Sequence, residues 1–165
     1  MKRKDLSEQE DKGLDYKEAL LRASALCSRQ EQCAGHIREK LRGWNVEDDD
    51  VKRIIKKLQE ENFLNDNRYA TFFVKDKFRF NRWGKIKISH ILRQKGIGGE
   101  TIREALEQIN QEDYFQTCLD LIQSKSATLK EKNQFTRKAK LFRFASNRGF
   151  ESDLIHRILN LEDND

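Results

Sequence analysis

The sequence contains no proline and only 8 glycines among its 165 residues. Proline breaks the interior of a helix and glycine weakens it, so their scarcity leaves almost every segment free to be helical. No segment sustains the alternation of apolar and polar residues that marks a strand without also fitting a helical period. The composition therefore predicts an all-α protein.

Long apolar runs and paired cysteines are also lacking. No apolar run approaches the ~20 residues that a membrane helix needs, and residues 1–12 are charged, without the apolar core of a secretory signal. The three cysteines, Cys27, Cys33 and Cys118, form no CxxC pair, which is typical of reduced thiols. We therefore expect a cytoplasmic protein with no membrane partner, a polar leader over residues 1–14 and Cys33 as a small core residue.

Catalytic and metal-binding signatures are absent from the sequence as well. It has no GxxxxGK[ST] loop, no HExxH and no nucleophile elbow. Its three histidines, His36, His90 and His156, lie far apart, and consecutive side chains in the aspartate run 48–50 would diverge by about 100° on a helix. We expect no catalytic residue, no cofactor and no metal, and an enzyme such as a nuclease is the least favoured alternative.

One pattern of apolar residues occurs three times, around Asn45, Gly96 and Gly149. The copies lie 51 and 53 residues apart, a period typical of tandem repeats. The apolar residues before and after each centre fall on one helical face, so each copy is a helix, a turn and a second helix. The recurring positions are Ile37, Leu41, Val46, Val51, Ile54 and Ile55, then Ile88, Leu92, Ile97, Ile102, Ala105 and Leu106, then Leu141, Ala145, Phe150, Ile155, Ile158 and Leu159.

Each repeat also has a leading helix, so we expect nine helices in three tandem three-helix repeats. The charged residues make up 37% of the chain, which favours thin, elongated packing of neighbouring modules over one deep core. The predicted repeats span residues 15–64, 65–110 and 111–161, and a polar tail follows at 162–165.

Local signals predict where several of these helices begin and end. Ser28 and Glu31 have the spacing of a capping box, so we expect them to start the second helix of repeat 1. Asn65 or Asn67 is the expected cap of the first helix of repeat 2. Repeat 3 is expected to have a longer polar connection over residues 124–134.

The aromatic residues of repeat 2 allow two interpretations. Tyr69, Phe72 and Phe73 have the spacing of a core-facing cluster. Phe80 and Trp83 also fit core positions, although their place among arginines is typical of proteins that stack on single-stranded nucleic acid.

The formal net charge is +5, but strongly basic and strongly acidic segments alternate along the chain. Residues 65–99 and residues 124–150 each carry a net charge of +7, whereas residues 100–123 carry −5 and the segment from 151 onward carries −4. Because stacked repeats place equivalent helices on one side, two basic helices are expected to form one surface for a polyanion. The candidate contact residues are Arg68, Lys75, Lys77, Arg79, Arg82, Lys85, Lys87, Arg93, Lys95, Arg137, Lys138, Lys140, Arg143 and Arg148.

A motif in repeat 2 resembles the central signature of the RecX family, bacterial regulators of the RecA recombinase. The matching residues are Phe63-Leu64-Asn65-Asp66-Asn67-Arg68-Tyr69-Ala70, Phe73-Val74, Lys77, Trp83-Gly84, Ile88, Leu92 and Lys95-Gly96-Ile97. The resemblance covers about residues 15–160 and is weakest in repeat 3. Asn65 stands where the family usually has aspartate, Lys85 where proline is common, and Trp44-Asn45 where Lys-Gly is usual.

The resemblance implies a non-enzymatic, negative regulator of RecA built from three three-helix repeats in an elongated, curved array. Such a protein docks on the filament of RecA and single-stranded DNA. It limits filament extension, ATP hydrolysis, strand exchange and cleavage of the SOS repressor. The implied partners are the RecA filament and single-stranded DNA, with double-stranded DNA left open, and the expected state is a monomer.

Two other classes of protein fit parts of the pattern. The pairs of helices have the size of helix-turn-helix units, so the main alternative is a stand-alone DNA-binding protein that does not act through RecA. A helical scaffold without nucleic-acid contact is the third class. Steep loss of DNA affinity with salt would separate a phosphate binder from a scaffold.

Overall fold

The computed structural model describes residues 13–161, and every regular secondary-structure element within them is a helix. The predicted leader lies mostly outside the described residues, and the predicted tail lies wholly outside them. The prediction of an all-α protein with nine helices in three triplets is confirmed for the described part of the chain, while the curvature of the array stays a prediction. The helices are α1 (Tyr16–Arg29), α2 (Ala34–Gly43), α3 (Asp48–Glu60), α4 (Asp66–Arg79), α5 (Lys85–Gln94), α6 (Gly99–Glu107), α7 (Gln111–Thr128), α8 (Gln134–Asn147) and α9 (Ser152–Leu161).

The turn between the second and third helix of each repeat has the same backbone conformation three times. Asn45, Gly96 and Gly149 have φ angles of 55°, 80° and 90°. This left-handed region costs glycine nothing and asparagine little, which explains why these two residue types mark the repeat. The predicted turn positions are therefore confirmed.

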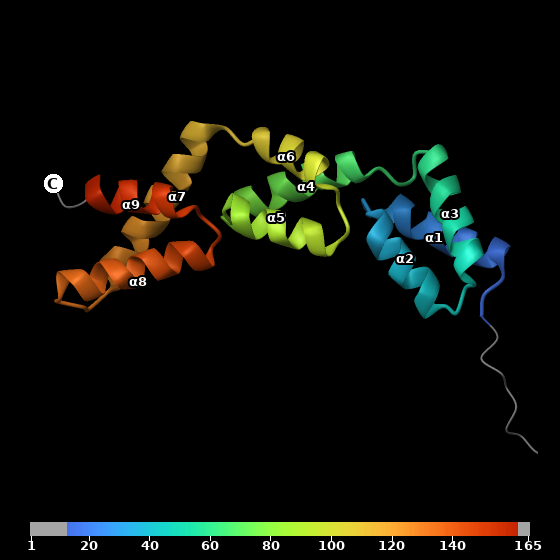
Figure 1. Ribbon diagram of the computed structural model, residues 1–165, viewed down its shortest axis with the longest axis horizontal. Coiled ribbons are helices and arrows are strands. Elements are labelled where there is room, and N and C mark those ends of the chain that lie inside the picture. Colours follow the sequence, from blue (N-terminus) through green and yellow to red (C-terminus); the bar gives the residue numbers. More distant parts are fainter. Residues whose placement is uncertain (1–12, 162–165) are drawn as a thin grey trace, which may run out of the picture. The chain divides into compact units, whose positions relative to one another are not determined.

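The chain divides into two compact units, the first of which ends at Tyr69. Its helices α1, α2 and α3 pack on one another (Figure 1). Their small and branched side chains meet in one core, with side chains such as Ala19, Ile37 and Ile54 fully buried. The predicted core role of Cys33 is confirmed, because its side chain is buried directly before α2.

The predicted capping box of α2 is wrong. Helix α1 continues past Ser28, whose hydroxyl donates within α1 to the carbonyl of Ser24 at 2.9 Å. Helix α2 begins only at Ala34, and the amide of Ala34 donates to Oδ1 of Asp66 at 3.1 Å. A side chain from the start of α4 therefore caps α2, a long-range partner that local spacing does not reveal.

Asparagine side chains cap two of the leading helices. Oδ1 of Asn65 accepts from the amide of Arg68 at 2.9 Å, which confirms Asn65 as the cap of α4. Asn110 caps α7, which then runs to Thr128. The predicted connection over residues 124–134 is therefore wrong, and only residues 129–133 separate α7 from α8.

The second compact unit begins at Ala70 and contains most of α4 and all of α5 to α9. Helices α7, α8 and α9 pack on one another, and α5 packs on α6. The recurring positions of repeats 2 and 3, such as Ile88, Leu92 and Ile155, are buried there as the repeat pattern predicts, except Leu106, which is only half-buried.

The start of α5 is joined to the end of α8 by main-chain hydrogen bonds. The amides of Gly84 and Ile86 donate to the carbonyls of Arg148 and Gly149 at 2.8 and 3.0 Å. Figure 1 shows the end of α8 beside the start of α5. The amides at the start of α5 have no partner within their own helix, and neither do the carbonyls at the end of α8, so each group satisfies the other. The two basic helices therefore follow one another head to tail.

A tyrosine completes this joint, which we call the α8–α5 joint. The hydroxyl of Tyr114 accepts from the amide of Lys85 at 2.9 Å and donates to Oε2 of Glu151 at 2.6 Å. Burial and the adjacent Glu151 carboxylate raise the pKa of Tyr114 well above its ordinary value. The hydroxyl therefore stays protonated and keeps both bonds at physiological pH.

Two predicted core aromatics are on the surface. Phe80 is 78% exposed and Phe72 is 57% exposed, so their assignment to the core is wrong. Phe80 follows the last residue of α4, where the helix ends and no neighbouring helix covers the ring. Trp83 is half-buried, and Val74 and Ala70 supply the buried face of α4 instead.

Gly84→Ala tests the α8–α5 joint, because an added Cβ would lie 2.2 Å from the carbonyl carbon and oxygen of Gly149. Backbone on both sides leaves no flexible end to move, so we expect the free energy of unfolding to fall by about 1–3 kcal/mol. Gly43→Ala is the matched control, since nothing lies within 4 Å of its added Cβ. Urea denaturation followed by circular dichroism measures both, and equal stability would contradict the joint.

Candidate nucleic-acid interface

Several of the predicted contact residues form hydrogen bonds or ion pairs within the protein, and Arg68 is the clearest case. Its Nε donates to Oε2 of Glu31 at 2.8 Å, and its terminal nitrogens donate to Oδ1 and the carbonyl of Asn62 at 3.0 and 3.2 Å. The hydrogen bond to Glu31 raises the pKa of Arg68 above its ordinary value. Arg68 therefore has a structural role, and its guanidinium is already engaged by Glu31 and Asn62.

Three basic residues of repeat 3 are also engaged. Arg137 donates to the carbonyls of Leu129 and Ser126, and so holds the short connection between α7 and α8. Lys140 forms an ion pair with Glu131 at 2.9 Å, and Arg148 donates to the carbonyl of Asn81 at 3.0 Å. These side chains have fewer donors left for a ligand than their charge suggests.

Five of the predicted residues have exposed side chains that make no hydrogen bond, ion pair or ring contact with the described part of the chain. They are Lys75, Arg79, Arg82, Arg93 and Arg143. Four of them lie between residues 75 and 93, on α4, on α5 and in the turn between these helices. Free donors on exposed arginines are well suited to phosphate oxygens.

Three lysines of the same region lie over aromatic rings. Nζ of Lys87 is 4.6 Å and Nζ of Lys77 is 5.8 Å from the centre of the Trp83 ring. Nζ of Lys85 is 4.7 Å from the centre of the Tyr114 ring. Lys77 is also paired with Asp76 at 2.8 Å. A ring face orients a cation without neutralising it, so the charges of Lys85 and Lys87 still act on an anion nearby.

The turn after α4 therefore combines unpaired arginines with aromatic side chains. We call this set the α4–α5 surface, and it comprises Arg79, Phe80, Arg82, Trp83 and Lys87. An exposed ring beside arginines is the combination with which single-strand binders stack on a base and hold its phosphates. The exposure of Phe80 thus favours the stacking alternative that the sequence left open.

Of the other predicted basic residues, Lys95 follows α5, and Lys138 lies on α8, as Arg143 does. On α6, Arg103 forms ion pairs with Glu100 and Glu107, which lowers the pKa of Glu100. The acidic face of α6 is therefore partly neutralised from within.

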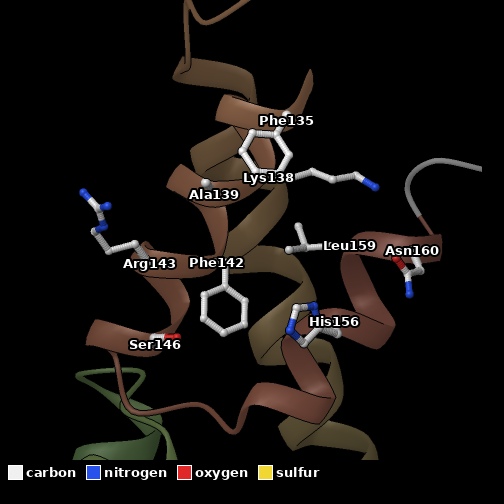
Figure 2. A pocket seen from close by; sticks show the side chains of 9 residues that line it. All are labelled: Phe135, Lys138, Ala139, Phe142, Arg143, Ser146, His156, Leu159 and Asn160. Atoms are coloured by element: carbon white, nitrogen blue, oxygen red, sulfur yellow. The ribbon is translucent and has the colours of Figure 1, made fainter. Parts of the chain in front are cut away.

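A groove of about 570 Å³ lies between α8 and α9 and has an apolar floor (Figure 2). Ala139, Phe142 and Leu159 line this floor, and the Phe142 and His156 rings have centroids 4.8 Å apart. Lys138 and Arg143 extend from α8 in different directions at its rim. The repeat pattern predicted that these residues lie on helices, but it did not predict a groove between the helices.

The thiols are the remaining candidates for chemistry, and burial makes them poor nucleophiles. Burial, with a smaller effect of Glu151, raises the pKa of Cys118 to about 12. Burial, followed by Glu31, raises the pKa of Cys27 to about 11. A thiolate is the reactive form of cysteine, so neither residue is activated.

No metal or membrane site is found in the described residues. Between residues 13 and 161, no three His, Cys, Asp or Glu side chains are grouped to hold a metal ion. In the same range, no helix combines the length and apolar character needed to cross a bilayer.

The fold and this surface define a helical-repeat protein with a basic, aromatic-bearing face in its second repeat. Two family models match the chain: RecX, second three-helix domain, over residues 65–106, and RecX, third three-helix domain, over residues 111–159. The chain therefore belongs to the RecX family, which confirms the resemblance of its central motif.

Individual relatives agree with this assignment. The chain is 32% identical over 159 residues to the regulatory protein RecX of Clostridium perfringens strain 13, covering 93% of this chain and 73% of the relative. It is 31% identical to regulatory protein RecX of Prosthecochloris aestuarii, covering 88% and 94% of the two chains. The crystal structure of RecX from Lactobacillus salivarius matches with a TM-score of 0.82 at 21% identity, covering 91% of this chain and 97% of that one, which supports the fold.

Arg68→Met and Arg79→Met form a matched pair that tests the division between structural and free arginines. Arg68→Met leaves the half-buried Glu31 carboxylate without its partner, so we expect the free energy of unfolding to fall by about 1–3 kcal/mol. Arg79→Met removes an exposed, unpaired side chain and should change stability by less than about 0.5 kcal/mol. Thermal melts that show the same loss for both variants would refute the assignment.

The thiols provide a test that depends on pH. At pH 8 only about a thousandth of a thiol with the pKa of Cys27, about 11, is ionised. Its reaction with Ellman's reagent should therefore be slow in the folded protein and about tenfold faster for each added pH unit below 11. Cys33 and Cys118 are buried and should react only after denaturation. Rapid labelling of all three native thiols at pH 8 would contradict this environment.

Proposed function

We propose that this protein is a non-enzymatic negative regulator of the RecA recombinase that docks on the filament of RecA and single-stranded DNA. In this role it limits filament extension, ATP hydrolysis, strand exchange and cleavage of the SOS repressor, and thereby acts in homologous recombination and DNA repair. Membership of the RecX family supports the regulatory role, and its relatives are named regulatory protein RecX. The protein is expected to act in the cytoplasm as a monomer.

The observation that carries the DNA contact is the α4–α5 surface. Arg79 and Arg82 have no partner among the described residues, and Phe80 between them is 78% exposed. Leaving such a ring in water costs free energy that a stacked base would recover. The arginines supply the sequence-independent attraction to phosphates that a filament of any sequence requires.

A regulator that holds several filament elements at once would slow their cycling. The chain carries its three repeats in tandem, so successive modules can contact successive parts of a repeating partner. Such contacts would favour one state of the filament and oppose the changes that accompany ATP hydrolysis. Regulation in this form needs no catalytic residue in the protein.

The first experiment measures the ATPase rate of the cognate RecA on single-stranded DNA while this protein is titrated. Inhibition at substoichiometric amounts is the expected result, because one molecule on a filament affects several subunits. An unchanged rate at equimolar protein and low salt would overturn the proposal and favour a stand-alone DNA-binding protein.

Replacing Arg79, Arg82 and Arg93 together by glutamine tests whether the free arginines between residues 75 and 93 bind DNA. If each contacts a phosphate, the plot of log affinity for single-stranded DNA against log salt concentration should become shallower by about 2 units. The control replaces Arg22, Lys52 and Lys56 by glutamine, which removes the same charge from exposed side chains already paired with carboxylates. Fluorescence anisotropy at several salt concentrations measures both slopes. Equal slopes for the variant and the control would remove these arginines from the interface.

A further inference from the structure

The groove between α8 and α9 differs in kind from the α4–α5 surface. Its floor is formed by apolar side chains of two helices, namely Ala139 and Phe142 from α8 and Leu159 from α9 (Figure 2). Its volume, about 570 Å³, lies in the range of sites that bury a ligand or a few side chains. Grooves between two helices with an apolar floor are typical receptors for an amphipathic helix.

An exposed phenylalanine extends the groove at one end. Phe135 lines the groove and is 84% exposed, the largest exposed fraction among the large apolar side chains between residues 13 and 161. Its ring lies on the first turn of α8, above Lys138 and Ala139 in Figure 2. An aromatic side chain left this open contributes little to the fold, so covering it would stabilise a complex.

Among the described residues, the charged side chains that line the groove are Lys138 and Arg143, and no aspartate or glutamate of the described residues lines it. The remaining polar lining consists of Ser146, His156 and Asn160. The Arg143 side chain is exposed and has no partner in the described part of the chain. A ligand that covers the apolar floor would therefore bring acidic groups to this rim.

We propose that the α8–α9 groove binds an acidic amphipathic helix of a protein partner. The apolar face of that helix covers Phe135, Phe142 and Leu159, and its carboxylates pair with Arg143 and Lys138. This inference rests on the proposed function, in which the partner is the recombinase. It assigns the protein contact to repeat 3 and leaves the DNA contact to the α4–α5 surface.

A nucleic acid fits the groove less well than a protein helix. Single-strand binders follow the backbone with a row of cations, whereas Lys138 and Arg143 are the only cations that the described residues bring to this groove, beside a mainly apolar floor. The free cations between residues 75 and 93 form the denser basic region. The chemistry of the two surfaces thus matches two different components of one filament.

Two double variants with the same chemical changes separate the two surfaces. Phe135→Ser with Arg143→Glu alters the groove, and Phe80→Ser with Arg79→Glu alters the α4–α5 surface. All four side chains are exposed, so both proteins are expected to fold, and circular dichroism verifies this. Each variant is measured for binding to bare fluorescein-labelled oligo(dT) and to a RecA filament preassembled on the same DNA with a non-hydrolysable ATP analogue.

The groove variant is expected to lose about tenfold or more in affinity for the filament while its affinity for bare DNA changes less than about threefold. The α4–α5 variant should lose affinity for bare DNA. Wild-type filament affinity in the groove variant would overturn this inference alone. Loss of bare-DNA binding by the groove variant would show that the groove binds nucleic acid. A wild-type dimer that becomes a monomer in the groove variant, measured by sedimentation, would show that the groove binds a second copy of this chain. Either result would overturn the inference of a helix-binding groove. A wild-type protein that does not bind the filament would instead overturn the proposed function.

Discussion

The need to satisfy the first backbone amides of the second helix in a repeat governs how these repeats are joined. At α2 the amide of Ala34 is bound by the side chain of Asp66, the first residue of α4, which is the leading helix of the next repeat. At α5 the partners are the Tyr114 hydroxyl and the carbonyls at the end of α8. In both places the repeat that follows supplies the cap, so a repeat is completed by its successor. A buried amide without a partner would cost more than most surface contacts contribute, which makes these caps decisive for the fold.

The same requirement decides which positive charges are free for a ligand. Arg68 lies two residues after the capping Asp66 and is bound to Glu31, and Arg148 supplies a carbonyl to α5 while its side chain reaches Asn81. Charge that serves the joints cannot serve the surface equally well. The free arginines lie instead at the end of α4, in the turn after it, on α5 and, in the case of Arg143, on α8. Some of the predicted basic residues thus stabilise the fold, and others are free to bind a ligand.

Much of this fold was predictable because its signals are periodic or local. The three turns at Asn45, Gly96 and Gly149 follow from a threefold apolar pattern and from the few residue types that tolerate a positive φ. The cap of α2 was not predictable, because its partner is 32 residues away and a local pair, Ser28 and Glu31, imitated a cap. The sequence could name the basic residues, but it could not divide them into those that are paired within the protein and those that are free, because a sequence does not show which carboxylate or carbonyl lies beside each charge. The α8–α9 groove was missed for a related reason: helical spacing identifies an apolar face but not whether another element fully covers it.

The α8–α5 joint also bears on how the chain forms during synthesis. Residues 84 and 86 leave the ribosome more than 60 residues before Arg148 and Gly149, which bind their amides. Until then the start of α5 has only water as a partner for these amides. Repeat 2 therefore stays incomplete while repeat 3 is translated, and these hydrogen bonds form only after the end of α8 has emerged. A nascent chain that is interrupted before α8 would leave the start of α5 without these partners, so this helix would open more easily than in the folded protein.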